Sequence, residues 1–425
     1  MNARLHLVEQ EPPAPQLLGG AVYHLGPGAG TMTDLEPESL AVHRARFGPR
    51  PNASGTDGDA LLTTLEAIGL TGRGGAHFPV ATKWRAVRAA GAEHGSVVVA
   101  NGAESEPLSA KDAALLELRP HLVLDGLVCA AEALYAQDVV VWLHEGAHAA
   151  RAALTRAIAE RAAAHLPEPP LRVVLGPGRY LSGESSAIVR ALSGGPALPA
   201  FRREAGQIAR INGRAALVQN VETLARVAVA AYDGADTATT LLTVTGPSHR
   251  AVLEVATSTR LREPITAVVG ATQVQAVLVG GYGGSWAPWA QVSELPATDS
   301  ALRPHGLSLG AGVLLALPAG SCGLHLTAEI TTYLAESSAR QCGPCLFGLR
   351  AVADLTAELA ARRVRRRDTA RLRRFLTEIS GRGGCHHPDG AVRMVASAMA
   401  TFAEDVSAHL HGRCLHEAGH RGRRG

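Results

Sequence analysis

Four cysteines towards the C-terminal end of the chain have the residue type and spacing to bind a metal ion or an iron–sulfur cluster. Cys342 and Cys345 are separated by two residues, and Cys385 and Cys414 follow in a region whose pattern is otherwise helical. Thiolates suit iron–sulfur clusters, whereas mixed cysteine and histidine sets suit zinc. A cysteine pair followed forty residues later by one cysteine is poor spacing for a zinc finger, so the pattern favours an iron–sulfur site.

A glycine-rich loop in the first quarter of the chain has the composition of a phosphate-binding turn. Glycines let the backbone approach a ligand and present successive N–H groups to it. The loop fails the Rossmann dinucleotide fingerprint, because His77 stands where glycine or alanine is needed, and it is not a Walker A motif. By itself it predicts either a phosphate site or a structural turn. The loop runs through Gly72, Arg73, Gly74, Gly75, Ala76, His77, Phe78 and Pro79, and Lys83 follows it.

Three polar loops stand next to stretches that resemble buried strands. The carboxyl ends of parallel strands are where open α/β sheets bind their ligands, so these loops are candidates for a cofactor site. Each loop taken alone is explained equally well as solvated surface with a helix cap. They are residues 101–107 with Asn101, Glu104 and Glu106, residues 178–186 with Tyr180, Gly183 and Glu184, and residues 219–223 with Gln219, Asn220 and Thr223.

The elements that position these residues fall into four segments and a tail. Residues 1–58 predict an irregular arm with one short helix near Pro37–Phe47. Alternating apolar strands and alanine-rich helices over 59–236 predict an α/β domain with a largely parallel sheet. Short strands broken by glycine and proline over 240–320 predict a small mixed β domain. Helical periodicity over 324–415 predicts a bundle that holds the cysteines, and 416–425 form a basic tail.

Composition narrows the class of protein. The chain has 425 residues, of which 19% are charged, and a formal net charge of +3, so bulk electrostatics do not favour nucleic acid as a partner. Six cysteines are too few for a secreted disulfide scaffold and indicate a reducing compartment. The absence of a signal peptide and of a long apolar run predicts a cytoplasmic protein, or one peripheral to the cytoplasmic face of a membrane, without a transmembrane segment.

Four motifs, in the same order along the chain, resemble those of the flavoprotein (NADH-binding) component of respiratory complex I and its relatives in NAD-reducing hydrogenases and formate dehydrogenases. Residues 72–84 are similar to this family's GRGGAGFPxGxKW loop, and residues 101–107 to its NADESEP motif. Residues 180–187 are similar to YxCGEETA, and residues 213–224 to GRPTxVNNVETL. The resemblance continues through the β segment to the cysteines and covers about residues 60–415.

This resemblance implies a Rossmann-like FMN-binding domain, a β-grasp-like SLBB domain at 240–320, and a C-terminal helical bundle with an iron–sulfur site. Cys342 and Cys345 match the last two cysteines of the family's SCGxCxPC motif, and Cys385 matches its distal ligand. Glu104 and Glu184 take the catalytic positions. The cofactor-binding positions are Gly72, Arg73, Gly74, Gly75, Ala76, Phe78, Lys83, Asn101, Glu104, Glu106, Tyr180, Gly183, Glu184, Arg202, Gln219, Asn220 and Thr223.

The activity implied is hydride transfer from NADH to FMN, followed by transfer of single electrons through a [4Fe–4S] cluster to a protein or quinone-linked acceptor. The partner would be a ferredoxin-like protein, a [2Fe–2S] subunit or a membrane redox protein. The basic run at residues 362–367 would either attract an acidic partner or form solvated surface.

The chain departs from the family pattern where the nicotinamide nucleotide would bind. Ser185 replaces the second glutamate of GEET, Ala86 replaces an aromatic residue, and Ala205 replaces the phenylalanine of RLKPPFP. Aromatic contacts contribute about 0.5–1.5 kcal/mol each, so their loss predicts weaker NADH binding. Two alternatives follow: a protein with the same cofactors that accepts electrons from a ferredoxin-like or quinol donor, and a non-catalytic assembly subunit.

The cluster motif departs as well. Ala339 stands where the family's first cysteine belongs, which leaves three matched thiols. Cys414, a histidine at 386 or 387, or an external ligand would supply the fourth, unless the cluster has three protein ligands or is absent. Cys129 and Cys322 are expected to be buried, inert thiols.

Overall fold

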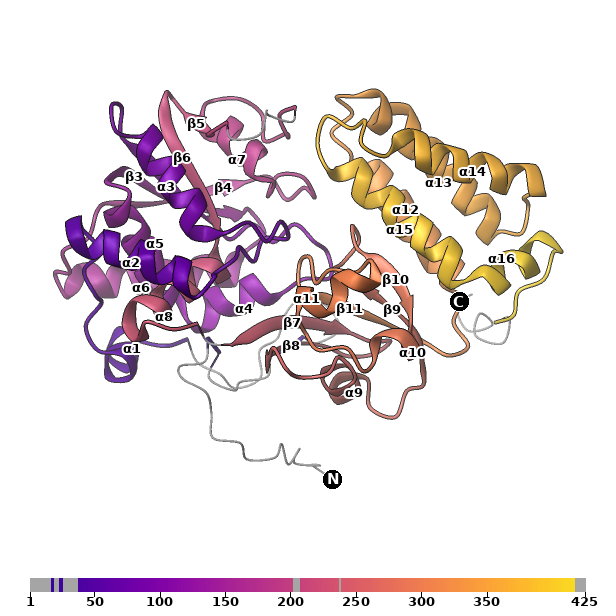
Figure 1. Ribbon diagram of the computed structural model, residues 1–425, viewed down its shortest axis with the longest axis horizontal. Coiled ribbons are helices and arrows are strands. Elements are labelled where there is room, and N and C mark those ends of the chain that lie inside the picture. The colour runs from indigo at the N-terminus through magenta and orange to yellow at the C-terminus, as the bar shows by residue number, and fades with distance from the viewer. Residues whose placement is uncertain (1–16, 19–22, 26–36, 202–206, 237, 417–425) are drawn as a thin grey trace.

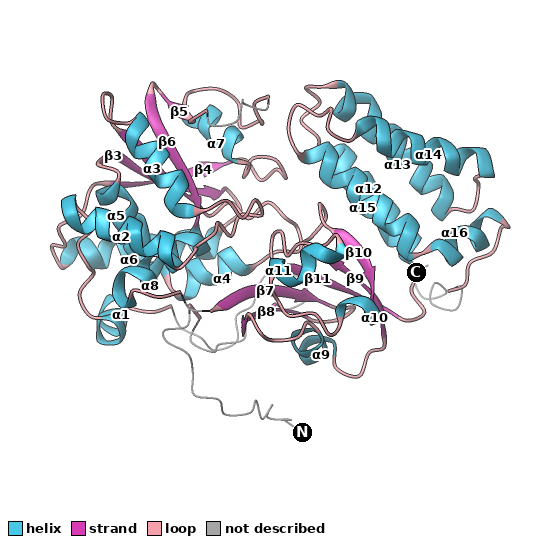
Figure 2. Ribbon diagram, in the orientation of Figure 1, coloured by secondary structure: helices cyan, strands magenta, loops and turns pink. Residues whose placement is uncertain are grey.

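The computed structural model describes the chain apart from residues 1–16, 19–22, 26–36, 202–206, 237 and 417–425. Figure 1 shows three parts: an α/β part in indigo to pink, a β-sheet part in darker orange below it, and a helical part in orange and yellow beside both. Among the described residues, strands occur in the first two parts, and the third contains helices and loops (Figure 2).

A five-stranded sheet forms the centre of the α/β part. Its order is β4-β3-β2-β6-β5, and every neighbouring pair is parallel except β5 with β6, as the apolar strand patterns predict. Residues 97–100 and 139–143 are buried, as expected for parallel strands covered on both faces. The strands are β2 (Ser96–Asn101), β3 (Ala136–His144), β4 (Leu171–Gly176), β5 (Arg210–Ile211) and β6 (Arg214–Asn220).

Eight helices accompany this sheet among the described residues. They are α1 (Leu40–Phe47), α2 (Gly55–Ala67), α3 (Val80–Ala90), α4 (Lys111–Leu118), α5 (Pro120–Ala133), α6 (His148–Ala163), α7 (Ser185–Leu192) and α8 (Val221–Asp233). Helices α5 and α8 approach so closely that a Cβ atom on Gly126 would lie 1.8 Å from the Leu224 carbonyl oxygen. Only glycine fits at that crossing, and the pair forms the main core together with α4 and α6.

A six-stranded mixed sheet forms the second part, in the order β1-β8-β7-β11-β9-β10. Its edge strand β1 comes from the segment expected to be irregular, and it pairs antiparallel with β8, where Tyr23 faces Val252. The strands are β1 (Tyr23–Leu25), β7 (Thr239–Thr245), β8 (Arg250–Ala256), β9 (Val274–Val279), β10 (Ser285–Pro288) and β11 (Val313–Pro318). Helices α9 (Arg262–Val269), α10 (Trp289–Val292), α11 (Asp299–Leu302) and the turn η1 (Arg303–His305) complete it.

The helical part begins directly after this sheet. It consists of α12 (Gly323–Glu336), the π-helical turn η2 (Pro344–Gly348), α13 (Leu349–Ala360), α14 (Arg366–Ile379), α15 (His387–Thr401) and α16 (Ala403–Leu410). Its core includes Leu349, Leu372 and Val395, and the Phe402 ring packs on Trp286 of β10 with centroids 5.2 Å apart. The predicted C-terminal bundle is therefore confirmed. Across the described helices, no segment combines the length and the apolar character that a membrane crossing would need.

Candidate functional site

A cavity of about 910 Å³ lies between the α/β part and the helical part. Its walls bring together four of the predicted cofactor residues, Phe78, Lys83, Tyr180 and Glu184, and the predicted cluster ligand Cys385. These residues come from the loop before α3, the first turn of α3, the loop before α7 and the turn before α15. The carboxyl end of the parallel sheet thus faces the bundle across one shared space, as expected for a ligand site in an open α/β sheet.

The glycine-rich loop is fastened to the start of α8 and to the second sheet. The Arg73 backbone N–H donates to Thr223 Oγ1 at 2.8 Å, and a Cβ on Gly74 would lie 3.4 Å from the Asn220 Cβ. His77 adopts a left-handed φ of 50°, a conformation that glycine adopts without strain. Its Nε2 lies 2.8 Å from Asp299 Oδ2 in α11. This contact anchors the loop to α11.

Lys83 reaches the cavity from the first turn of α3. Its Nζ donates to the Val218 carbonyl oxygen in β6, and burial lowers the pKa of the ammonium to about 8. The side chain is therefore held at the end of a parallel strand, with Val218 lining the same cavity. An ammonium in such a place is favourable for an electron-rich or anionic ligand.

Two residues of the loop at 101–107, Asn101 and Glu104, hold neighbouring loops and helices in place. Glu104 is not among the residues that line the cavity, and it accepts hydrogen bonds from the Asp112 and Ala113 backbone N–H groups at 3.2 and 3.0 Å, at the start of α4. Asn101 also lies outside the cavity lining, where its Nδ2 donates to the Gly183 carbonyl oxygen at 2.9 Å. Glu104 and Asn101 therefore support the loops around the cavity, and the expected catalytic role of Glu104 stays a prediction.

Glu106 is a buried carboxyl between two parts of the molecule. Its Oε2 accepts the Tyr282 backbone N–H at 3.0 Å and the Tyr180 hydroxyl at 3.3 Å, while its Oε1 is buried without a hydrogen-bond partner among the described residues. Burial raises the pKa of Glu106 to about 7, and the hydrogen bonds from Tyr282, Leu108 and Tyr180 only partly offset it. Burial also raises the pKa of the Tyr180 hydroxyl, so that hydroxyl stays a donor.

Glu184 forms the N-cap of α7. Its Oε2 accepts the Ser186 and Ala187 backbone N–H groups at 2.9 and 3.2 Å and a further hydrogen bond from the Ser186 hydroxyl. The Ser186 hydroxyl in turn accepts the Ala200 backbone N–H at 2.9 Å. Ser185 lines the cavity, so the substitution of serine for the family's glutamate changes the charge of the wall itself.

Asn220 and Gln219 lie at the end of β6, behind the glycine-rich loop. Asn220 caps α8 through its Oδ1, which accepts the Glu222 N–H, and its Nδ2 donates to Asp112 at 2.6 Å. Gln219 Oε1 is buried and has no partner among the described residues. Its Nε2 would lie 3.8 Å from a Cβ on Gly72, so the amide abuts the loop. Arg202, another predicted contact, lies outside the described residues.

Three of the four predicted metal ligands converge. Cys342, Cys345 and Cys385 line one small pocket next to the large cavity, and Ala339 lines it with them. Burial, followed by the neighbouring Cys342 and Cys385 thiols, raises the pKa of Cys345 to about 12. The pocket shares Ala200, Phe201, Gly384 and Cys385 with the cavity, so the thiols lie at one end of it. The π-helical turn η2 places Cys345 there, and such turns are frequent at functional sites.

Cys414 does not join this group. Its thiol interacts with Cys322, which lies near His409, and His409 contacts the Leu359 carbonyl oxygen at the far end of α13. Cys345 precedes α13 at the other end, about 20 Å away at 1.5 Å of rise per residue. This arrangement corrects the expectation that Cys414 completes the thiol set. The motif alone could not show it, because the separation results from how the helices pack.

The histidines beside Cys385 also line the cavity. His387 is buried and its Nε2 lies 2.8 Å from the Leu334 carbonyl oxygen, whereas His386 has an exposed side chain near Asp389. Sequence reasoning missed Gln341, which lines the thiol pocket and accepts a hydrogen bond from Arg190. It also missed Asp299, the first residue of α11, and Tyr282, in the loop between β9 and β10, because neither lies in a motif. A bare carboxylate or tyrosine in a loop carries no signal that could have found them.

Comparisons with known proteins agree with this arrangement. Residues 65–229 match the Nuo51 FMN-binding domain, and residues 325–409 match the NADH-ubiquinone oxidoreductase-F iron-sulfur binding region. The F subunit of the NADH-quinone oxidoreductase of Streptomyces coelicolor is 27% identical over 381 residues, with 84% of each chain covered. The Escherichia coli protein of the same name is 27% identical over 405 residues, covering 89% of this chain and 91% of the relative.

A solved structure shares this fold. A chain of the NAD+-reducing [NiFe]-hydrogenase in the H2-reduced state superposes with a TM-score of 0.77 at 25% sequence identity, over 90% of this chain and 68% of that one. The air-oxidized form gives a TM-score of 0.78. With both family regions matched in order and the cavity between them, the chain belongs to the family of the FMN- and iron–sulfur-binding F subunits of NADH-quinone oxidoreductases.

Proposed function

We propose that this protein is an oxidoreductase of the NADH dehydrogenase type that uses FMN and an iron–sulfur cluster. The observation that carries the proposal is the single cavity whose walls hold Lys83, Tyr180 and Glu184 at one side and Cys385 at the other. When bound, a flavin accepts a hydride as an electron pair and a cluster receives single electrons from it. A wall shared by both sites is what transfer between the two cofactors requires.

The residues fit FMN. The cavity volume falls in the range of about 300–1,000 Å³ that is usual for small-molecule and cofactor sites. The buried Gln219 Oε1 lacks a partner among the described residues, and the Gln219 amide lies beside the glycine-rich loop, whose glycines would let a phosphate approach the backbone closely. Residues 72–76 would hold the phosphate, and Lys83 and Tyr180 would contact the ring system. Glu104 and Asn220 would keep both loops in place through α4 and α8.

The thiol pocket fits an iron–sulfur cluster with three protein ligands, Cys342, Cys345 and Cys385. The alanine at 339 leaves one position of the set without a protein thiol. The exposed Leu346 and Phe347 follow Cys345 directly, with exposed fractions of 45% and 71%. Large apolar side chains at the surface beside a redox centre suit the docking of another redox protein, and we assign the acceptor's approach to this face.

The nucleotide side of the cavity differs from that of a strongly binding family member. Phe78 remains, 53% exposed at the cavity wall, and Glu106 with its buried Oε1 remains behind Tyr180. Ser185 and Ala86 line the wall without the charge and the aromatic ring of the family motifs. NADH would therefore bind with reduced affinity. A ferredoxin-like or quinol donor is the second candidate, favoured by these two positions.

Lys83 provides the test of the flavin site. Lys83→Met should lower the FMN content of reconstituted protein at least tenfold, since the buried ammonium at the end of β6 is lost. Arg85→Met is the matched control on the same helix, because Arg85 is half exposed and pairs with Glu66 on the surface. Fluorescence of released flavin measures the content. Equal FMN in Lys83→Met and wild type would contradict the proposed site.

A further inference from the structure

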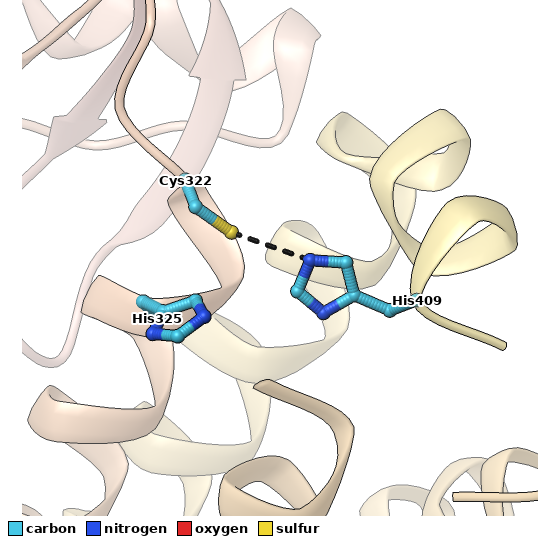
Figure 3. A group of neighbouring side chains, drawn as sticks. All are labelled: Cys322, His325 and His409. Atoms are coloured by element: carbon cyan, nitrogen blue, oxygen red, sulfur yellow. Dashed lines mark hydrogen bonds between the residues drawn. The ribbon is translucent and has the colours of Figure 1, made fainter. Parts of the chain in front are cut away.

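A second group of metal-binding side chains lies at the junction of the β-sheet part and the helical part, away from the cavity. Cys322 precedes the first residue of α12, His325 lies in the first turn of that helix, and His409 lies in the last turn of α16. One ligand atom from each lies within 4.8 Å of the others. Figure 3 shows the thiol and the His409 ring pointing at each other, with the His325 ring beside them.

The distance between two of the ligand atoms suits a tetrahedral metal ion. Cys322 Sγ and His409 Nε2 are 3.6 Å apart. Zn–S distances of about 2.3 Å and Zn–N distances of about 2.0–2.1 Å, at a tetrahedral angle, separate two such ligand atoms by about 3.5–3.6 Å. The His325 and His409 rings stand 5.9 Å apart at 77°, so they do not stack on each other. The spacing of the pair therefore equals the spacing that a zinc ion would impose.

The surroundings orient the ligands as in known metal sites. His409 is fully buried, and its Nδ1 lies 2.9 Å from the Leu359 carbonyl oxygen. This carbonyl fixes the tautomer with the proton on Nδ1, which leaves the Nε2 lone pair free to bind a metal. Cys322 is 4% exposed, and its sulfur accepts backbone hydrogen bonds from His325 and Leu324. Burial outweighs these donors and raises the pKa of the Cys322 thiol to about 12, so metal binding would release a proton from this thiol.

Cys414 lies beside this group through its contact with Cys322, outside the set of three residues whose ligand atoms are within 4.8 Å of one another, and a bound ion would have to draw its thiol in as the fourth ligand. Cys414 is half-buried, and its thiol interacts with the Cys322 thiol. The four residues then follow the pattern Cys-x2-His at the start of the bundle and His-x4-Cys at its end. A set of two cysteines and two histidines suits zinc and leaves no open position, which is typical of a structural site. A groove of about 490 Å³ lined by His325 and Glu329 gives a path for the ion.

We propose that Cys322, His325, His409 and Cys414 form a structural zinc site that ties the C-terminal end of α16 to the start of α12. Cys322 was expected to be inert and Cys414 to bind the cluster. A zinc site would give both residues one shared role. Zinc here would close the helical bundle at the point where it leaves β11. The proposal does not depend on the flavin or on the reaction.

The decisive test combines metal content with X-ray absorption at the zinc edge on the full-length, reconstituted protein. We expect about one zinc per chain and a shell of two sulfur and two imidazole nitrogen neighbours at the distances given above. This measurement is specific for zinc, so an iron–sulfur cluster does not obscure it. A sulfur-only shell would place zinc in the pocket of Cys342, Cys345 and Cys385 and overturn the proposal. Absence of zinc after growth and dialysis with zinc chloride would overturn it too.

Variants locate the ion. Cys322→Ser and His409→Asn should each reduce bound zinc at least tenfold and leave the iron content unchanged. Cys342→Ser should reduce the iron content and leave bound zinc unchanged. His411→Asn is the matched control, because His411 is exposed, lies two residues after His409 and bonds to the Ser407 carbonyl. If Cys322→Ser fails to fold, the zinc content and X-ray absorption of the wild-type protein still test the proposal. A Cys322–Cys414 disulfide in protein purified without air would contradict the site, and so would a melting temperature that a zinc chelator leaves unchanged.

Discussion

At the residue scale, Glu106 is a buried carboxyl beside the candidate site whose charge state depends on its surroundings. Burial raises its pKa from 4.5 to about 7, so the folded protein holds a proton that the unfolded chain releases at lower pH. The stability that this proton contributes is present below pH 4.5 and is lost as the pH rises through 7. A shift of this size corresponds to about 3 kcal/mol, as an order of magnitude.

Glu106→Gln should therefore remove part of the pH dependence of stability. Glutamine keeps the acceptor for Tyr282 and the tyrosine hydroxyl, and it cannot ionise. We expect the melting temperature of the wild type to fall between pH 5 and pH 8 by several degrees more than that of the variant. Glu66→Gln serves as control, because the Glu66 side chain is 62% exposed on the surface. Parallel pH profiles for wild type and Glu106→Gln would show that Glu106 is ionised throughout.

Position 339 offers the converse experiment, in which a side chain is added. Ala339 lines the pocket of the three thiols, so Ala339→Cys should place a fourth thiol in the set. We expect the variant to keep about four irons per chain through a desalting column and the wild type to keep fewer. Ala335→Cys, one turn earlier in α12, is the control. Equal iron retention in all three proteins would mean that residue 339 does not face the cluster.

At the scale of elements, the hydrogen bond between His77 and Asp299 joins the glycine-rich loop to α11. Burial acts to raise the pKa of Asp299, but hydrogen bonds from His77 and the Leu309 N–H hold it at about 2. The contribution of this carboxylate to stability is thus present above pH 3.8 and is lost as the pH falls through 2. The same contact involves the residue of the loop that adopts a left-handed φ of 50°.

Asp299→Asn should loosen that connection. We expect a loss of about 1–3 kcal/mol at pH 7, because a hydrogen bond to a charged group of low exposure is weakened. Retained FMN should fall with it, since the phosphate loop loses its anchor. Thermal unfolding with and without added FMN measures both effects. Asp59→Asn, which removes a surface pair with Arg88, should change neither, and an equal effect of the two variants would contradict the anchoring role.

The elements themselves were largely predictable. Apolar runs such as 97–100 and 139–143 predict buried parallel strands, and glycine and proline breaks after 240 predict short strands in a mixed sheet. Strand β1 was not predictable, because three residues in a proline- and glycine-rich arm carry no strand pattern and pairing with β8 alone defines them. The position of Cys414 was not predictable either. Its neighbour in space, Cys322, lies at the start of the helical part, whereas Cys414 follows the last helix.

At the scale of the whole molecule, the three parts meet around one cavity. The α/β part supplies Lys83 and Glu184, the second sheet supplies Gly283, and the helical part supplies Cys385 and Arg393. The sequence motifs predict most of the cavity residues in the α/β part, because the glycines and polar residues of these motifs follow strands. The contributions of the other parts depend on how the parts dock, which local pattern does not encode. The zinc site proposed at the far side of the bundle would fix the end of the chain without touching this cavity.

The most direct test of the central claim is an anaerobic absorbance titration with NADH of protein reconstituted with FMN, iron and sulfide. The account predicts that NADH bleaches the flavin bands, with an elevated half-saturation because Ser185 and Ala86 weaken the nucleotide site. Dithionite defines the fully reduced end point. Flavin and cluster that are bound and respond to dithionite, but remain oxidised at millimolar NADH, would contradict the proposed NADH dehydrogenase activity and leave a protein or quinol as the electron donor.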